Sequence, residues 1–105
     1  NMLSTKFMTI VLRNDFLSEV CDKIKVLGHP LRIKIVEHLE KGDASVSQIM
    51  KSLDVSQPIT SQHLLLMKSK GILRSRREGN VIIYSIKDTM ILGLLSCLRK
   101  SQQNF

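Results

Sequence analysis

Apolar side chains recur every three or four residues in the first part of the chain, a spacing typical of amphipathic helices. One run begins after Asp15 and ends at Gly28. Its apolar positions are Leu17, Val20, Cys21, Ile24 and Leu27. A second run follows His29-Pro30 and covers 31–39. Because Asp favours helix starts, and Gly and Pro favour helix ends, the pattern predicts two helices here.

Two shorter helices joined by a tight corner are predicted next. Ser45 or Ser47 can cap a helix that runs to Leu53, and the corner is 54–56. Pro58 is tolerated in the first turn of the following helix, which ends at Gly71. That helix has an unusually polar beginning, made by Ser56, Gln57, Thr60, Ser61 and Gln62.

After Gly71 the spacing changes to the alternation of β-strands. Strands are predicted over 72–76 and 81–86, on either side of a turn at 78–80. Three arginines, Arg74, Arg76 and Arg77, lie on the first strand and at the turn. Alternation places Arg74 and Arg76 on one face of this hairpin.

A last helix is predicted from Met90 to about Arg99, with Asp88 or Thr89 as its cap. It is apolar nearly all the way round, at Met90, Ile91, Leu92, Leu94, Leu95, Cys97 and Leu98. A helix without a polar face has to be covered on every side. We therefore expect part of its surface to contact a partner.

The order of four helices, two strands and one helix predicts a mainly α protein with a small β-hairpin. This is the build of a winged helix-turn-helix, with about five helices and a two-stranded wing. A chain of 105 residues fits one domain. We assign that domain to 15–100, leave the structure of 1–14 open, and treat 101–105 as a C-terminal tail.

Charge adds a candidate partner to this fold. Sixteen Lys and Arg against nine Asp and Glu give a formal net charge of +7, and 43% of residues are hydrophobic. Such a balance favours polyanions, although it is weak evidence without the placement of the charges. Here the basic hairpin follows the polar helix start, which is the arrangement expected for double-stranded DNA binding.

The predicted DNA-binding residues are Ser56, Gln57, Thr60, Ser61, Gln62, His63, Lys68, Arg74, Arg76 and Arg77. Gln57 and Gln62 are the best candidates for base contacts, since a Gln amide can bind adenine through two hydrogen bonds. Two structural alternatives remain open: a solvated helix face, and a strand edge protected by charge. Lys68 and Lys70 would also suit the negative end of a helix dipole.

The chain resembles the ArsR/SmtB family of bacterial winged-helix repressors. The resemblance spans Asp15 to Leu98 and rests on the motifs LGHPLRIKIV at 27–36, SQHL at 61–64, RREGN at 76–80 and YSI at 84–86. It implies a homodimer built by the first and last helices, operator binding by the fourth helix and the wing, and release by an inducer. We expect the interface at Leu17, Val20, Cys21, Ile24, Ile91, Leu94, Leu95 and Leu98.

The sequence departs from the family's two well-known metal sites. Ser45 and Ser47 stand where a thiolate pair would fall, and serine is a poor ligand for soft metals. In the last-helix zinc site only Asp88 fits, because Met90, Ser101 and Asn104 replace the other ligands. The three histidines, at 29, 38 and 63, are scattered, so we expect structural or DNA roles for them. The sequence predicts no metal and no cofactor.

Cys21 and Cys97 leave two interpretations open. Each lies on an apolar helical stripe, and a lone Cys there is usually a small core hydrophobe. Some members of the family sense oxidants or reactive sulfur through a cysteine pair. That pair commonly uses the second helix, where this chain has Glu37.

Other classes of protein find little support in the sequence. No apolar run approaches the roughly 18 residues needed to cross a bilayer, and no secretory signal is evident, so a cytoplasmic protein is expected. No catalytic constellation is present, which argues against an enzyme. The predicted function is a homodimeric repressor of an inverted-repeat operator. The alternative is a winged-helix module for protein contacts.

Overall fold

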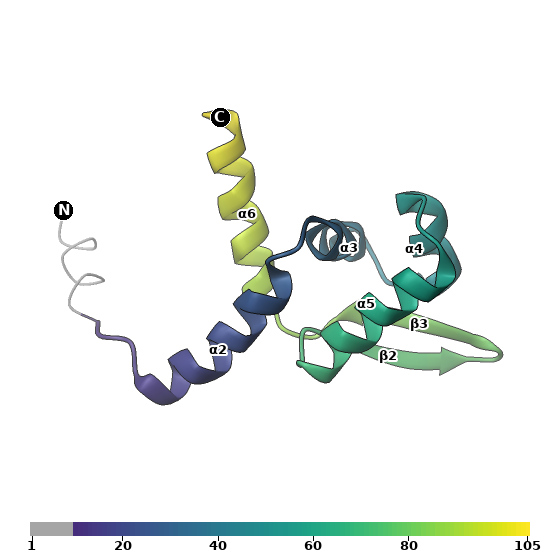
Figure 1. The fold of residues 1–105 in the computed structure, drawn as a ribbon, viewed down its shortest axis with the longest axis horizontal. Coiled ribbons are helices and arrows are strands. Elements are labelled where there is room, and N and C mark those ends of the chain that lie inside the picture. Colours follow the sequence, from purple (N-terminus) through teal and green to yellow (C-terminus); the bar gives the residue numbers. More distant parts are fainter. Residues whose placement is uncertain (1–9) are drawn as a thin grey trace.

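The computed structural model describes residues 10–105, so most of the segment 1–14 lies outside it. The described residues form five helices and a small sheet (Figure 1). In chain order the elements are α2 (Asn14–Leu27), α3 (Pro30–Glu40), β1 (Ala44–Ser45), α4 (Val46–Leu53), α5 (Gln57–Ser69), β2 (Leu73–Glu78), β3 (Val81–Ile86) and α6 (Met90–Gln103). The predicted fold class, a mainly helical winged helix-turn-helix, is confirmed.

Local signals set most helix ends as expected. Gly28 is the C-cap of α2, and the His29 side chain caps α3 by accepting a hydrogen bond from the Leu31 amide over 3.1 Å. Pro30 starts α3, where its missing N–H has no helical partner to lose. Asp15 was predicted to start α2 as its cap, but it lies inside the first turn of the helix. Its negative charge there is favourable to the helix dipole.

The corner between α4 and α5 makes the helix-turn-helix. Ser45 and Gln48 form a reciprocal capping box at the start of α4. At its end Asp54 takes the left-handed conformation, with φ of 53°, and the Val55 amide donates to the Met50 carbonyl over 3.2 Å. This sharp reversal allows α5 to begin at Gln57 and to pack across α4.

The sheet has three strands in the order β1-β3-β2, so the prediction of two strands is incomplete. β1 was not predicted from the sequence, because its two residues are too few to show an alternation of apolar and polar positions. Ala44 pairs with Tyr84 and Ser45 with Ile83. The hairpin between β2 and β3 closes tightly at Gly79-Asn80, where only Gly79 has a positive φ, of 62°. A positive φ at the first turn position alone is the type II′ requirement, which glycine meets without strain.

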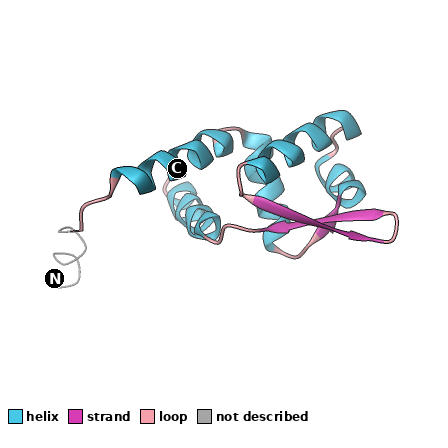
Figure 2. Cartoon of the chain, turned by 90° about the horizontal axis from the view of Figure 1, so that it is seen from below, coloured by secondary structure: helices cyan, strands magenta, loops and turns pink. Residues whose placement is uncertain are grey.

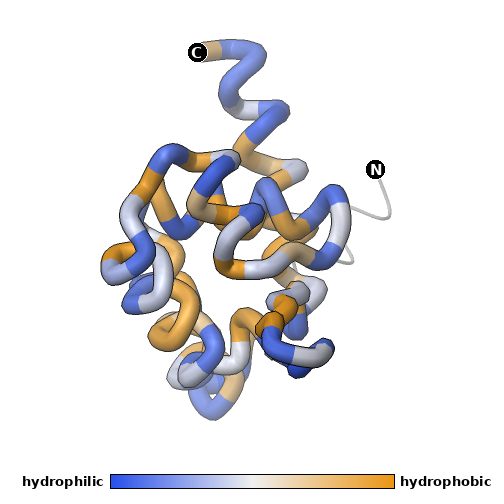
Figure 3. Tube along the Cα trace, turned by 90° about the vertical axis from the view of Figure 1, so that its right-hand side faces the viewer, coloured by the Kyte–Doolittle hydropathy of each residue, from blue (hydrophilic) through white to orange (hydrophobic). Residues whose placement is uncertain are grey.

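α6 continues to Gln103, so 101–105 is largely helix rather than a separate tail. The sequence pattern stops earlier because the apolar positions end at Leu98, whereas polar residues continue a helix without such a face. The last turns project away from the rest of the molecule and are mainly hydrophilic (Figures 1 and 3).

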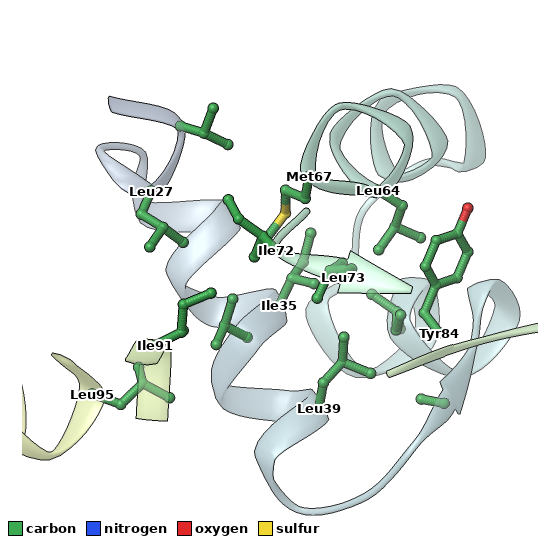
Figure 4. Packing of buried hydrophobic residues seen from close by; sticks show 14 residues of the cluster. Leu27, Ile35, Leu39, Leu64, Met67, Ile72, Leu73, Tyr84, Ile91 and Leu95 are labelled. Atoms are coloured by element: carbon green, nitrogen blue, oxygen red, sulfur yellow. The ribbon is translucent and has the colours of Figure 1, made fainter. Parts of the chain in front are cut away.

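One core holds the helices and the sheet together (Figure 4). α3 supplies Ile35, Val36 and Leu39, and side chains from the other elements pack around them. They are Val26, Leu27, Ala44, Ile49, Leu64, Met67, Ile72, Leu73, Tyr84, Ile91 and Leu95. The hairpin extends beyond this core and ends at a tip away from α2 and α6 (Figures 1 and 2). The helix-turn-helix and the wing are therefore set on a rigid base.

Candidate DNA-binding face

The outward face of α5 carries most of the polar residues predicted from the sequence. Ser56 is its N-cap, Gln57 and Gln62 are exposed, and Ser61 is half-buried. Pro58 lies in the first turn. Short hydrogen-bonding side chains at the start of an exposed helix suit the edges of bases in a major groove.

Thr60 and His63 lie on the opposite, inward face, which corrects the prediction that they contact DNA. Thr60 is only 1% exposed, and its hydroxyl donates to the Ser56 carbonyl over 2.8 Å. His63 is 9% exposed. Helical spacing places both residues on the side of α5 that carries the buried Leu64, and not on the side that carries the exposed Gln62. Neither side chain can therefore reach a base.

His63 instead lies where hydrogen bonds link the three helices α2, α3 and α5. The Arg32 Nε donates to His63 Nδ1 over 3.0 Å, and Arg32 Nη1 donates to the carbonyl of Val26 over 3.0 Å. The rings of His29 and His63 lie 4.9 Å apart. Burial, followed by the charge of Arg32 and the proximity of His29, lowers the pKa of His63. A neutral His63 thus accepts the bond that ties α5 to α2 and α3.

The wing places its arginines on two faces. Pairing of Arg74 with Ser85 and of Arg76 with Ile83 puts these two arginines on one face, as alternation requires. Arg77 pairs with Ile82 and shares the other face with Leu73 and Tyr84, which point into the core. Arg77 is the arginine nearest the turn, and it is exposed.

Arg76 forms ion pairs with two carboxylates. Its Nη1 lies 2.6 Å from Asp43 Oδ2, and its Nε lies 2.8 Å from Glu78 Oε1. Hydrogen bonds to Asp43 and then Glu78 raise the pKa of Arg76. The sequence did not reveal this pairing, because Asp43 precedes β1 and reaches the wing only through the third strand. Arg76 braces the wing and is a weaker candidate for phosphate contact than Arg77.

A hollow of about 380 Å³ lies between α5 and the wing. Gln57, Ser61 and Leu65 line it from the helix, and Asn80 and Ile82 line it from the hairpin. Neither Leu65 nor Asn80 was among the residues predicted to bind DNA, although Leu65 is 60% exposed. A concave strip with amides and hydroxyls along a projecting helix can receive a DNA backbone.

The expected dimer residues divide into three groups by their exposure. Val20, Ile91 and Leu95 are buried within the chain's own core or beside it, so they cannot be the main contacts of an interface. Leu17 and Leu94 are half-buried. The exposed members are Cys21, Ile24 and Leu98, and the sequence missed their exposed neighbours Phe16 and Met90. An apolar surface therefore remains on α2 and α6.

Both cysteines are exposed in the single chain, and neither forms a disulfide. They are therefore not part of the core of the single chain.

Asp88, the carboxylate that fits the family's zinc site, is held by a lysine. Lys23 Nζ lies 2.6 Å from Asp88 Oδ2, and Asp88 Oδ1 accepts the Met90 amide at the start of α6. The Lys23 hydrogen bond, with help from the Met90 amide, lowers the pKa of Asp88. Ser45 is buried and caps α4. Among residues 10–105, no group of three or more His, Cys, Asp or Glu side chains is arranged to hold a metal ion.

No helix within the part of the chain that the structure describes is long and apolar enough to cross a membrane.

Comparison with known proteins shows which proteins this chain is similar to. The family described as "Bacterial regulatory protein, arsR family" matches residues 29–75, from the cap of α3 into β2. The transcriptional repressor PagR of Bacillus anthracis is 37% identical over 82% of this chain and 87% of its own length. Its crystal structure superposes with a TM-score of 0.75, at 33% identity, over 82% of this chain and 99% of that one.

Two further comparisons point to the same kind of protein. A biofilm growth-associated repressor of Agrobacterium fabrum is 33% identical over 77% of this chain and 69% of its own length. The solution structure of a possible ArsR-family regulator from Mycobacterium bovis has a TM-score of 0.75 at 25% identity. It covers 85% of this chain and 82% of that one, and is described as a homodimeric winged helix-turn-helix DNA-binding domain.

Proposed function

This chain belongs to the ArsR family of bacterial regulatory proteins, and we propose that it is a homodimeric transcriptional repressor that an inducer releases from its operator. α5 enters the major groove, and the wing lies on the flanking backbone. Gln57 and Gln62 contact base edges, while Ser56, Ser61 and Arg77 contact phosphates. The protein acts in the cytoplasm, where its DNA is.

One observation carries this proposal: the polar start of α5 and the hairpin residue Ile82, which pairs with the exposed Arg77, line the same hollow. A helix of this kind next to a basic hairpin matches the two contacts that a winged helix makes with DNA. The net charge of +7 supports the same partner, because it attracts a polyanion over a longer range.

The exposed apolar side chains of α2 and α6 support a dimer. Phe16, Ile24, Met90 and Leu98 are each more than a third exposed, at 44%, 53%, 38% and 41%. Apolar residues gathered on two adjacent helices are typical of a protein contact surface. A twofold dimer then reads two half-sites about one helical turn apart, which makes the operator an inverted repeat.

The inducer is proposed to act through a chemistry other than metal binding. Lys23 already neutralises Asp88, and the oxygens of Ser45 and Ser47 are poor ligands for soft metals. The two exposed thiols, Cys21 and Cys97, support an oxidant or reactive sulfur species as the signal. Mass and thiol counting after peroxide or persulfide treatment tests this, since two unmodified thiols with unchanged DNA binding contradict it.

The proposed function is tested by selecting duplexes from random-sequence DNA with the purified protein. We expect enrichment of an inverted repeat, and weaker binding when Arg76 and Arg77 are both changed to Ala. A mobility shift that is unaffected by that double change contradicts the role of the wing. If no duplex is enriched and none binds at low salt, the chain is better explained as a winged-helix module for protein contacts.

A further inference from the structure

Three cations gather at the base of the wing, at the end opposite its turn. Lys68 comes from the last turn of α5, Arg74 from the start of β2 and Lys87 from the residue after β3. Together with Leu73 and Ser75 they line one hollow of about 390 Å³. We call these three cations the basal cluster. The sequence did not single out Lys87, because only the pairing of Leu73 with Ile86 brings it beside Arg74.

The basal cluster differs from Arg76 in having no carboxylate partner. None of its three side chains forms an ion pair within residues 10–105, and no Asp or Glu lines the hollow. Like charges held close together repel each other, so an anion between them is favoured. Lys68 also suits the negative end of the α5 dipole, so Arg74 and Lys87 are the stronger evidence for an anion.

The backbone around this hollow can add uncharged donors. Among residues 10–105, β2 is an edge strand, with β3 on one side and no strand on the other. An edge strand presents backbone N–H groups that no neighbouring strand accepts from. Lysine, arginine and backbone N–H groups together are the donors that phosphate groups of nucleic acids receive in protein complexes.

We propose that the basal cluster binds backbone phosphate at the centre of the operator, as an anchor separate from the tip of the wing. This inference rests on the proposed function. Lys87 lies just before α6, whose exposed Met90 belongs to the apolar surface assigned to the dimer. The tip of the wing points away from α2 and α6 (Figure 1). In a dimer built on these helices, the two basal clusters face the segment between the half-sites and the two tips face its outer flanks.

The test compares Lys87→Gln with Lys100→Gln, an equal loss of charge at an exposed site on α6. Binding to a duplex selected by the wild-type protein is measured by fluorescence anisotropy between roughly 50 and 200 mM salt. Each phosphate that the protein no longer neutralises lowers the slope of log affinity against log salt by about 0.9, so Lys87→Gln should reduce the slope by about two units per dimer. Lys100→Gln should keep the wild-type slope. Thermal melting checks that both variants fold.

A second measurement locates the contact on the DNA. Neutral methylphosphonate linkages are placed either between the half-sites or at the outer flanks of the duplex. The central substitution should weaken DNA binding by the wild-type protein and leave binding by Lys87→Gln almost unchanged. The outer substitution should weaken binding by both proteins equally. Such non-additivity is the signature of a direct pairwise contact.

Three results would overturn the inference. Equal salt slopes for the wild type and Lys87→Gln, with DNA binding intact, reject it while leaving the proposed function standing. Tight binding of inorganic pyrophosphate that Lys87→Gln abolishes, without any change in the DNA slope, assigns the basal cluster to a free phosphorylated molecule instead. A wild-type protein that binds no duplex rejects both the proposed function and this inference.

Discussion

The two halves of this molecule expose different combinations of side chains. In the half made by α4, α5 and the sheet, Ile49, Leu64 and Leu73 are at most 1% exposed. Its exposed apolar residues Leu65 and Ile82 line a hollow together with polar side chains of α5 and the hairpin. In the half made by α2 and α6, apolar side chains such as Ile24 and Leu98 remain about half exposed. Both halves expose apolar side chains, but in the first half these lie among the polar side chains of α5 and the basic hairpin. The contrast separates a face suited to DNA from a face suited to protein.

The largest expected effect comes from the half that contains α5. Leu64 is fully buried, so Leu64→Ala should lower the free energy of unfolding by about 3 kcal/mol, because packing is weakened and a cavity forms. Its neighbour Leu65 is 60% exposed, and Leu65→Ala should change stability by less than about 0.5 kcal/mol. Urea denaturation of this matched pair measures both values. Similar destabilisation at the two positions would contradict the inward and outward faces assigned to α5.

The next effect tests the half made by α2 and α6. Leu98→Glu places an unpaired charge in the proposed interface, so dimer affinity should fall by about 2 kcal/mol, or roughly thirtyfold. Ser96→Glu adds the same charge on a different side of α6 and should leave association unchanged. Sedimentation over a range of protein concentrations distinguishes the two. Equal dimer affinity for both variants would place the interface elsewhere.

A smaller effect is expected at the wing. Arg77→Ala should lower the salt slope of DNA binding by about 0.9 for each copy that contacts phosphate. Arg76→Ala should change the slope less, because Asp43 and Glu78 already neutralise Arg76. Anisotropy titrations at several salt concentrations compare the two variants. If Arg76→Ala has the larger effect, its carboxylate partners must exchange for phosphate when DNA binds.

The smallest effect is a pH dependence of folding stability that comes from His63 on α5. Because the pKa of His63 is lower in the folded protein than its usual value, the unfolded chain binds more protons between the two pKa values. Stability contributed by neutral His63 is therefore present above the usual pKa and is lost as pH falls toward the folded pKa.

Urea titrations from roughly pH 8 to pH 5.5 test this pH dependence against the linkage relation. His63→Asn keeps an acceptor near the position of Nδ1 but cannot titrate in this range. Its stability should fall less steeply than that of the wild type as the pH is lowered. Parallel curves would show that other groups cause the wild-type dependence.

Helix positions and the polar start of α5 were predictable from the sequence because both depend on short-range rules. Apolar spacing, the His29-Pro30 break and the capping Ser45 act within a few residues of one another. The hairpin was equally accessible, since Gly79-Asn80 separates two strands of alternating residues. The hydrophilic end of α6 was missed because helix length does not depend on apolar spacing alone.

The sequence by itself determined the class of fold, the positive charge and the position of the polar helix start ahead of a basic hairpin. Only the tertiary structure decided which of those side chains face outward. It turned Thr60 and His63 inward, paired Arg76 with Asp43, and brought Lys87 beside Arg74. The physical reason is that helical and strand periods are local, whereas burial and ion pairing depend on contacts between segments far apart in the chain.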